Sequence, residues 1–367
     1  MDILKISNLN IPVPVIQGGM GVGVSLSGLA SAVANQGGVG VISSAGLGLL
    51  SKYKGATYLE ANIMALKDEL RKAREKTDGI LGVNIMVAMS NFVDMVKTSI
   101  SEKVDIIFSG AGLPLDLPSY LNKDSVTKLV PIVSSGRAAK IICDKWKKQY
   151  DYLPDAIVVE GPKAGGHLGF KTNQIADKNY SLEQLLPEVV NTAKSYEDEY
   201  NVKIPVIAAG GVYTGQNIHD MIKLGASGVQ MGTRFVTTNE CDASEAFKQT
   251  YIDSKAEDVE IIQSPVGMPG RAIKSNFIDK VREGYKQPKN CSFKCIRTCD
   301  VKTSPYCIIG ALISAFKGNF ENGYAFAGTN AYLAEKIISI KETFDNIKRE
   351  YFESKQEADL SLLQSRL

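Results

Sequence analysis

One of the two histidines of the chain, His167, lies in the glycine-rich segment EGPKAGGHLGF (160–170). Glycine at this density weakens both helices and strands, so the segment is expected to be a loop with room for a ligand beside the imidazole. An imidazole with a pKa of about 6.5 can act as a general base at neutral pH. We therefore expect His167 to be a catalytic base, with a structural histidine as the alternative. The other histidine, His219, is expected at a surface position of a helix.

Two later segments, AAGGVYTG (208–215) and QMGTRF (230–235), carry residues suited to binding an anion. Glycine lets backbone N–H groups approach a phosphate closely, and a helix that begins near Thr214 would add the positive end of its dipole. The expected phosphate ligands are the backbone N–H groups of Gly210, Gly211, Gly232 and Thr233 together with the Thr233 hydroxyl. The alternative is that these glycines only form tight turns.

Other short segments carry small and polar residues that suit an aromatic cofactor. They include Gln17, Gly18, Gly19, Met20, Asn84, Ser109–Gly112 and Ser134–Gly136. Glycine allows a flat ring to lie against the backbone, and the amide of Asn84 can both donate and accept hydrogen bonds at a ring edge. Each segment alone is more simply interpreted as a turn, whereas together they indicate one polar site.

These residues follow short apolar runs that must be strands for the site to assemble. The runs are 13–20, 39–46, 81–87, 106–112, 129–136, 156–161, 206–211 and 228–235. Continuous apolarity is typical of parallel strands that are buried on both faces. Helical patterns fill the gaps, with expected capping boxes at Thr57/Glu60 and Ser181/Gln184. The sequence therefore predicts a (β/α)8 TIM barrel, with an open doubly wound sheet as the alternative.

The position of the anion-binding segments agrees with this fold. Active sites of such barrels lie at the carboxyl ends of the strands, and a phosphate site often follows strands seven and eight. The segments 208–215 and 230–235 come at the ends of the last two apolar runs. We expect residues 1–250 to form the barrel.

Residues 251–367 are expected to form an appendage that packs on the barrel. Residues 260–273 are expected to be extended with turns, and 329–356 to form a long amphipathic helix. The four cysteines of this part have the spacing C-x3-C-x3-C-x7-C and are Cys291, Cys295, Cys299 and Cys307. The first three would share one face of a helix. An iron–sulfur cluster or zinc is one interpretation, and inert thiols are the other, because the usual C-x2-C pair is missing.

The overall composition excludes several classes of function. The 367 residues carry a net charge of +2, with 44% hydrophobic and 22% charged residues. This is ordinary for a globular protein, and the even charge balance indicates neither nucleic acid nor an anionic membrane as a partner. The first residues, MDILKISNLNIP, do not resemble a signal peptide. We expect a cytoplasmic protein with a small-molecule substrate, and the composition leaves room for a homodimer.

Six motifs in order give the chain a family resemblance. They are QGGM (17–20), GVNIMV (82–87), SGAGLP (109–114), EGPKAGGHLGF, AAGGVYTG and GVQMGTRF (228–235). This series resembles the nitronate monooxygenase family, formerly called 2-nitropropane dioxygenase, whose superfamily includes the flavin-dependent enoyl-ACP reductases. The resemblance covers roughly residues 1–275 and the motif AGTNAY at 327–332. The cysteine-rich segment is not part of it.

The resemblance implies FMN at the strand ends. When the motifs are matched, the residues that would contact the ring are Gln17, Gly18, Gly19 and Met20. The ring would be flanked by Asn84 and Ser134 and would lie near Gly165 and Gly166. The phosphate would be held by Gly210, Gly211, Gly232 and Thr233. His167 matches the catalytic histidine of the family. The implied reaction is oxidation of an alkyl nitronate with O2 to a carbonyl compound and nitrite. With a neutral nitroalkane, His167 would first remove the α-proton.

Two other functions remain open at this point. One is NAD(P)H-dependent reduction of an enoyl thioester, although no clear pyridine-nucleotide fingerprint is present in the sequence. The other is a non-catalytic barrel that binds a flavin or a phosphate, which would have no need of a base at His167.

Overall fold

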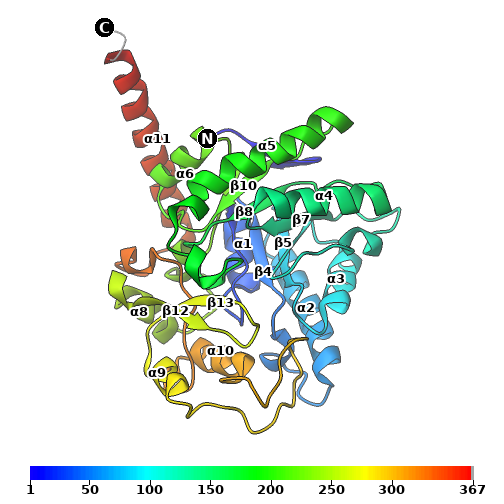
Figure 1. Cartoon of the computed structure of the whole chain (residues 1–367), viewed down its shortest axis with the longest axis vertical. Helices are drawn as coiled ribbons and strands as arrows, with labels where there is room; N and C mark the ends of the chain where they lie inside the picture. Colours follow the sequence, from blue (N-terminus) through cyan, green and yellow to red (C-terminus); the bar gives the residue numbers. More distant parts are fainter. Residues whose placement is uncertain (365–367) are drawn as a thin grey trace.

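The computed structural model describes residues 1–364, and a barrel of eight parallel strands lies at its centre (Figure 1). The strands are β3 (Val15–Gln17), β4 (Gly40–Ser43), β5 (Leu81–Met86), β6 (Ile106–Gly110), β7 (Lys128–Val133), β8 (Ile157–Glu160), β10 (Val206–Ala209) and β11 (Gly228–Met231). Their order is β3-β11-β10-β8-β7-β6-β5-β4, and the Gln17 N–H donates to the Val39 carbonyl beside β4 at 2.9 Å. Each strand overlaps one of the apolar runs. The (β/α)8 barrel is therefore confirmed, and the open sheet is wrong.

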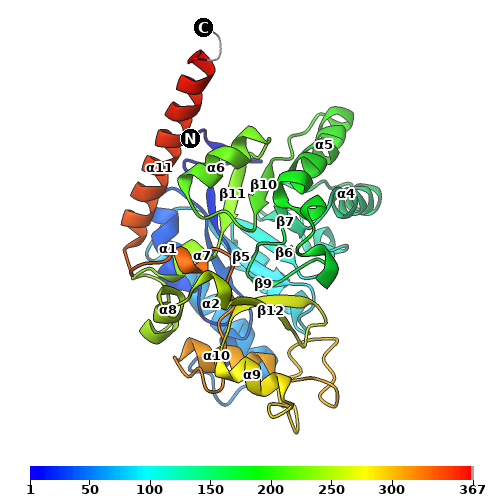
Figure 2. The same cartoon turned by 60° about the vertical axis from the view of Figure 1, so that its left-hand side comes forward.

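Helices follow the strands and cover the outside of the barrel (Figure 2). They are α1 (Ser27–Asn35), α2 (Tyr58–Arg74), α3 (Phe92–Ser101), α4 (Gly136–Tyr150), α5 (Leu182–Tyr200), α6 (Gly215–Lys223) and the short α7 (Thr233–Val236). At α2, the Thr57 hydroxyl accepts from the Glu60 N–H at 3.3 Å and the Glu60 carboxylate accepts from the Thr57 N–H at 3.0 Å, which confirms this capping box. At α5 the expected box with Gln184 is wrong, because the Ser181 side chain accepts no capping hydrogen bond from the described first turn.

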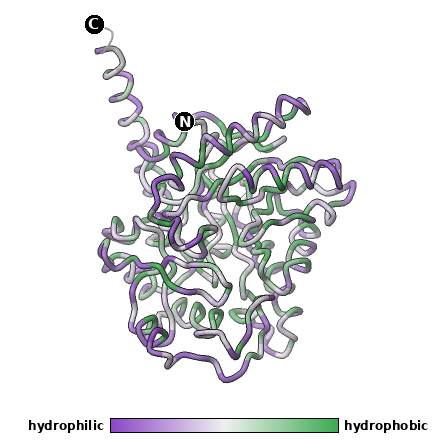
Figure 3. Tube along the Cα trace, in the orientation of Figure 1, coloured by the Kyte–Doolittle hydropathy of each residue, from purple (hydrophilic) through white to green (hydrophobic). Residues whose placement is uncertain are grey.

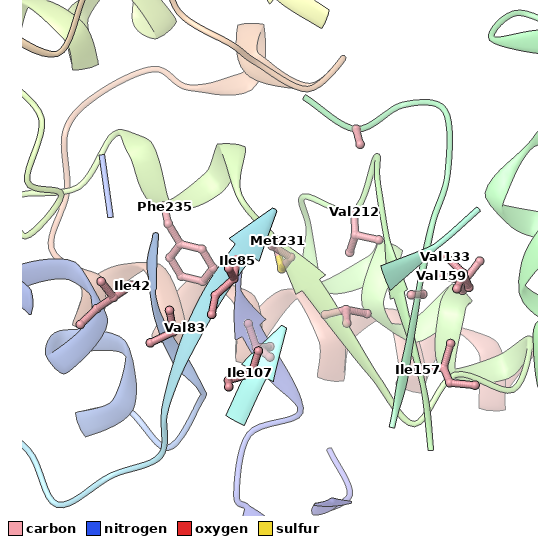
Figure 4. Close-up of a cluster of buried hydrophobic side chains, with 14 of the residues drawn as sticks. Ile42, Val83, Ile85, Ile107, Val133, Ile157, Val159, Val212, Met231 and Phe235 are labelled. Carbon is pink, nitrogen blue, oxygen red and sulfur yellow. The ribbon is translucent and has the colours of Figure 1, made fainter. Parts of the chain in front are cut away.

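Buried apolar side chains form one layer inside the barrel and another between strands and helices. The inner cluster includes Val41, Phe108, Val130, Val158 and Ile207. Alternate residues of the same strands, such as Ile42, Val83, Ile107 and Val159, point outward and pack under the helices (Figure 4). A hairpin of β1 (Leu4–Ile6) and β2 (Leu9–Ile11) adds its apolar side chains to the inner cluster. The strand alternation thus decides which residues can reach the barrel interior.

Most of the chain after the last barrel strand packs beside the carboxyl ends of the strands, whereas its last helix lies beside α6. Its elements are α8 (Glu245–Ile252), β12 (Val259–Gln263), β13 (Pro269–Ile273), α9 (Asn276–Arg282), α10 (Ile308–Phe316) and α11 (Ile340–Gln364). The antiparallel hairpin β12–β13 agrees with the extended segment expected at 260–273. The division at residue 250 remains a prediction.

The long helix α11 runs beside α6 and then projects beyond the rest of the molecule (Figures 1 and 2). It begins at Ile340 rather than near residue 329, because a 3-10 turn at Ala331–Leu333 precedes it. Hydrophilic and hydrophobic residues alternate along the outer helices (Figure 3), as expected where one face of a helix covers a sheet. Within residues 1–364, no helix has the length and apolarity that crossing a membrane requires.

Candidate active site

A cavity of about 250 Å³ lies at the carboxyl ends of the barrel strands. Barrels of this kind place their active sites at that end. The barrel contributes the strand ends, and the segment after β8 contributes residues 163–167. The C-terminal part contributes Leu312 of α10 and residues 326–330. Both parts of the chain are therefore needed to build the cavity.

The floor of the cavity is the uppermost layer of inward-pointing residues of the barrel. One residue from each strand or strand end forms this layer, and these residues are Gly18, Ser43, Asn84, Gly110, Ile132, Glu160, Ala209 and Gln230. The layer below is apolar, with Val41, Phe108 and Val158 among its members. The floor can therefore make hydrogen bonds to a ligand while the barrel beneath it excludes water.

Several glycines of the cavity wall permit close approach of a ligand. A side chain at Gly19 would place its Cβ 2.3 Å from the Cβ of Asn84. At Gly166, whose φ is +79°, an added Cβ would meet no atom within 4 Å, and at Gly232 its nearest neighbour would be the Met20 sulfur at 3.5 Å. A substituent at Gly166 would thus project into open space that a flat ligand can fill, whereas one at Gly232 would contact the Met20 side chain.

Backbone N–H groups without protein acceptors gather at the ends of β10 and β11. Among residues 1–364, the N–H groups of Gly210, Gly211, Gly232 and Thr233 donate to no protein atom. The two strands are neighbours in the barrel, so these donors lie on the same side of the cavity. Lys163 lines the same cavity. Unpaired N–H groups next to a cation form a suitable anion site.

The amino terminus of α6 is not part of this anion site. The Glu350 carboxylate of α11 accepts a hydrogen bond from the Gly215 N–H at 2.7 Å, and Glu350 also pairs with Arg234 at 3.3 Å. The Asn217 side chain accepts from the Thr214 N–H at 3.1 Å. A carboxylate from the chain itself thus satisfies the positive end of this helix. The contribution that the sequence suggested for the helix beginning near Thr214 is wrong.

His167 lies in a short strand rather than in the expected loop. Strand β9 (Gly166–His167) pairs with β13, and the His167 Nε2 is 2.7 Å from the Ser264 hydroxyl. The ring meets the edge of Phe326 at a centroid distance of 5.0 Å, and His167 is among the residues that line the cavity. Desolvation lowers the pKa of His167 from 6.5 to about 4. The imidazole is therefore neutral at pH 7 and is a weaker base than the sequence suggested.

The side chain of Arg271 holds the backbone that leads to His167 by hydrogen bonds. Its guanidinium donates to the carbonyl of Pro162 and, at 2.9 Å, to the carbonyl of Ala164. Burial lowers the pKa of Arg271 to about 10, and within the described chain no carboxylate pairs with it. Because both acceptors are neutral carbonyls, the buried charge serves to hold this backbone rather than to form an ion pair.

The sequence model of the nitronate monooxygenase family matches residues 3–350. The chain belongs to this family. It is an oxidoreductase, and family membership supports a flavin as its cofactor.

Relatives of this family member differ in their named activities. A probable nitronate monooxygenase of Staphylococcus aureus (strain MSSA476) is 29% identical over 314 residues, which cover 75% of this chain and 79% of the relative. The (3aS,4S,5R,7aS)-5-hydroxy-7a-methyl-1-oxo-octahydro-1H-indene-4-carboxyl-CoA dehydrogenase of Rhodococcus jostii (strain RHA1) is 29% identical over 268 residues, 73% of this chain and 64% of that protein. This chain thus spans just under two thirds of the dehydrogenase.

Solved structures support the same fold. FabK from Thermotoga maritima superposes with a TM-score of 0.72 and 27% identity, covering 95% of this chain and 96% of FabK. A nitroalkane oxidase from Streptomyces ansochromogenes superposes with a TM-score of 0.72 and 19% identity, covering 95% and 98% of the two chains. At that identity the second similarity shows the fold alone.

Most of the residues suggested by the sequence lie together in this family member. Those that line the cavity are Gly18, Gly19, Met20, Asn84, Gly165, Gly166, His167, Gly210, Gly211, Gly232 and Thr233. Gln17 and Ser134 do not line it. The Gln17 amide is buried and bonds to the backbone of Val41 at 3.0 Å, whereas the Ser134 hydroxyl donates to the Gly169 carbonyl at 2.9 Å. Both side chains therefore support the backbone around the site.

Sequence reasoning missed the polar floor residues Ser43, Glu160 and Gln230. Glu160 begins the segment EGPKAGGHLGF, and Gln230 begins QMGTRF. Both residues therefore lie in motifs that were interpreted through their histidine, glycine or threonine residues. The signal that would have found them is strand parity, because Val158 and Glu160 must point to the same side of β8. Ser264 has no comparable local signal.

The four cysteines do not form the expected helix. In residues 291–306 the chain runs in turns, and Cys307 caps α10. Within residues 1–364, no group of three or more His, Cys, Asp or Glu side chains is arranged to hold a metal ion. Burial, reinforced by the other three thiols, raises the pKa of Cys295 to about 12. The iron–sulfur or zinc interpretation is therefore unsupported.

His219 also differs from its expected surface position. It is buried on α6, with its Nδ1 3.0 Å from the Ser354 hydroxyl of α11. Its ring meets the edge of Tyr351 at a centroid distance of 5.5 Å. The residue joins two helices and lies apart from the residues that line the cavity.

Proposed function

We propose that this chain is an FMN-dependent oxidoreductase that oxidises alkyl nitronates with O2 to a carbonyl compound and nitrite. The observation that carries the proposal is one cavity that combines unpaired N–H donors at the ends of β10 and β11 with the imidazole of His167. The N–H groups would bind the phosphate of the cofactor, and the imidazole would be a polar group near the substrate in the same cavity. Membership of the family supports this combination.

The residues present suit FMN. The N–H groups of Gly210, Gly211, Gly232 and Thr233 would hold the phosphate, with Lys163 offsetting part of its charge. The open space at Gly166 would admit a flat ring, whose edge can bond to the amide of Asn84. When bound, FMN supplies the electron transfer between the nitronate and O2, and the protein supplies position and electrostatics. The products require one oxygen atom to bond to the carbon as the C–N bond breaks.

His167 would act on the substrate as a neutral imidazole. One ring nitrogen is held by the Ser264 hydroxyl, and the Nδ1 has no partner among the described residues. A general base works best when its pKa is near the operating pH, so a pKa of about 4 makes His167 a poor acceptor for the α-proton of a neutral nitroalkane. We therefore propose the nitronate anion, which has already lost that proton, as the preferred substrate form.

A second candidate function is the reduction of an enoyl thioester by NAD(P)H. It is favoured by the Rhodococcus jostii relative, whose name specifies a carboxyl-CoA substrate. The nitronate proposal takes precedence because the relative from Staphylococcus aureus covers more of both chains. A non-catalytic barrel offers no reason for a histidine among the residues that line the cavity.

Parallel assays of the FMN-loaded protein separate the two candidates. We expect oxygen uptake with propyl-2-nitronate in air, a much slower rate with neutral 2-nitropropane, and no rapid bleaching of the flavin by NADH under anaerobic conditions. His167→Ala should lower the rate with the nitronate while FMN binding is retained. Fast bleaching by NADH without nitronate turnover would support the reductase instead, and a protein that takes up no FMN would contradict both.

A further inference from the structure

Glu160 is the acidic residue of the cavity floor, and the proposed reaction leaves it without a role. It ends β8 and points into the barrel above Val158. Among residues 1–364, no side chain or backbone group makes a hydrogen bond to its carboxyl group. Part of the side chain faces the cavity. A carboxyl group so placed can interact with whatever lies on the floor.

The register of three neighbouring strands determines what surrounds Glu160. Ala209 of β10 pairs directly with Glu160 on one side and with Gln230 of β11 on the other. The small side chain of Ala209 leaves the space between the two longer side chains open to the cavity. On the other side β7 ends at Val133, and its residue that lines the cavity, Ile132, pairs with Val158, which lies below Glu160. The carboxyl group thus has one apolar wall and, across Ala209, a neutral amide.

Few charged or titratable groups face Glu160. The other such groups that line the cavity are Lys163 and His167 from the segment after β8 and Tyr251 from α8. The strands on either side of β8 contribute none, since the residues of β7 and β10 that line the cavity are Ile132 and Ala209. Burial alone raises the pKa of Glu160 from 4.5 to about 7, without an opposing contribution from Lys163. The group can therefore change its protonation state near neutral pH.

We propose that Glu160 takes up a proton when the flavin on the cavity floor is reduced and gives it back on reoxidation. The inference rests on the proposed function, in which FMN occupies the cavity. It concerns the proton that the Glu160 carboxyl group itself binds. Reduction of the flavin by two electrons and one proton would add one negative charge to its ring. A like charge close by raises the pKa of a carboxyl group, so an ionised Glu160 binds a second proton from solvent at a carboxylate oxygen. The electrons come from the nitronate, and O2 removes them.

Glu160 is accordingly a positioning and charge-balancing residue. In its protonated form its O–H can donate a hydrogen bond to the electron-rich ring, which an ionised carboxylate cannot do. Proton binding at Glu160 and reduction of the flavin are thermodynamically linked, and such linkage is reciprocal. Protonation of Glu160 therefore makes the bound flavin easier to reduce. The effect should therefore be visible in the midpoint potential, independently of any turnover.

The test is the pH dependence of the midpoint potential of the FMN-loaded protein, compared with Glu160→Gln. For a two-electron couple, each proton taken up shifts the potential by about 30 mV per pH unit. Above pH 7 the slope of the wild-type protein should exceed that of Glu160→Gln by about this amount, and below pH 6 the two slopes should agree. Glu183→Gln, which changes an exposed carboxylate on α5, is the matched control and should follow the wild type.

The outcomes separate this inference from the proposed function. If FMN binds and the slopes of wild type and Glu160→Gln agree above pH 7, the role of Glu160 is overturned while the proposed function stands. If no FMN binds, both are overturned. Should Glu160→Gln fail to fold, an indicator dye decides with the wild-type protein alone. Proton uptake per flavin reduced should be greater at pH 8 than at pH 6, and equal or smaller uptake at pH 8 overturns the inference.

Discussion

Replacing Arg271 by methionine should loosen the segment that carries His167. The Arg271 guanidinium donates to the carbonyls of Pro162 and Ala164, the second at 2.9 Å. Hydrogen bonds from a charged donor contribute about 1.5–3 kcal/mol each. Methionine is of similar length and removes the cost of burying a charge, which offsets part of this sum. We expect a net loss of about 2–4 kcal/mol in the free energy of unfolding, because two buried carbonyls lose their donor.

Urea unfolding followed by circular dichroism measures this loss. Arg349→Met is the matched control, because Arg349 and its partner Glu353, 3.1 Å away, are both exposed. Exposed ion pairs contribute about 0–1 kcal/mol. Arg271→Met should also lower kcat/KM for the nitronate at least tenfold, since small displacements of a reacting group are costly. A change in stability no larger than that of Arg349→Met, with kcat/KM unaltered, would refute the reasoning.

Further predictions concern pH, hydrogen bonding, glycine and metal content. In the cofactor-free protein, the Glu160 carboxyl group should lose about 3 kcal/mol of its contribution to stability between pH 4.5 and about 7, because the unfolded state loses this proton first. His167 contributes in the opposite direction between pH 4 and 6.5, but it is the same in Glu160→Gln. The difference in stability between the two proteins in urea titrations should therefore change by about 3 kcal/mol from pH 5 to pH 8, and parallel pH profiles would contradict this. Ser264→Ala should lower kcat/KM for the nitronate about tenfold, equivalent to one hydrogen bond, at unchanged FMN affinity; an unchanged kcat/KM would show that Ser264 does not position His167. Gly210→Ala should destabilise the protein by more than about 1 kcal/mol and weaken FMN binding in a fluorescence titration, because φ is +91° and the new Cβ would lie 2.6 Å from the Gly161 carbonyl oxygen; wild-type FMN affinity would count against the phosphate site. Elemental analysis of anaerobically purified protein should find no stoichiometric iron or zinc, and one metal per chain would reverse the conclusion about the cysteines.

The barrel and the site's location could be predicted because both depend on local patterns. Parallel strands buried on both faces give continuous apolar runs, and the fold places the glycines after 206–209 and 228–231 at the same edge. The glycine-rich motifs therefore indicate the position of the cavity without any knowledge of tertiary contacts.

The environment of the site could not be predicted, because distant segments create it. Ser264 follows His167 by 97 positions, and the carboxylate of Glu350 reaches Gly215 from a helix 135 positions away. No local pattern in the sequence specifies such contacts. His219 was misplaced for the same reason, since α11 covers it.

The cysteine spacing was misleading because a regular interval does not ensure a helix. Residues 291–306 run in turns, with Cys295 bonded through its carbonyl to the Ser90 N–H at 3.1 Å. Contacts with the loop after β5 thus override the periodicity of this segment. Tertiary contacts commonly dominate weak local preferences.

Nitrite formation from propyl-2-nitronate by the FMN-loaded protein in air tests the central claim most directly. The account predicts that nitrite appears together with oxygen uptake, that both depend on added FMN, and that His167→Ala slows both without loss of the cofactor. A protein that binds FMN tightly but forms no nitrite from the nitronate would contradict the account.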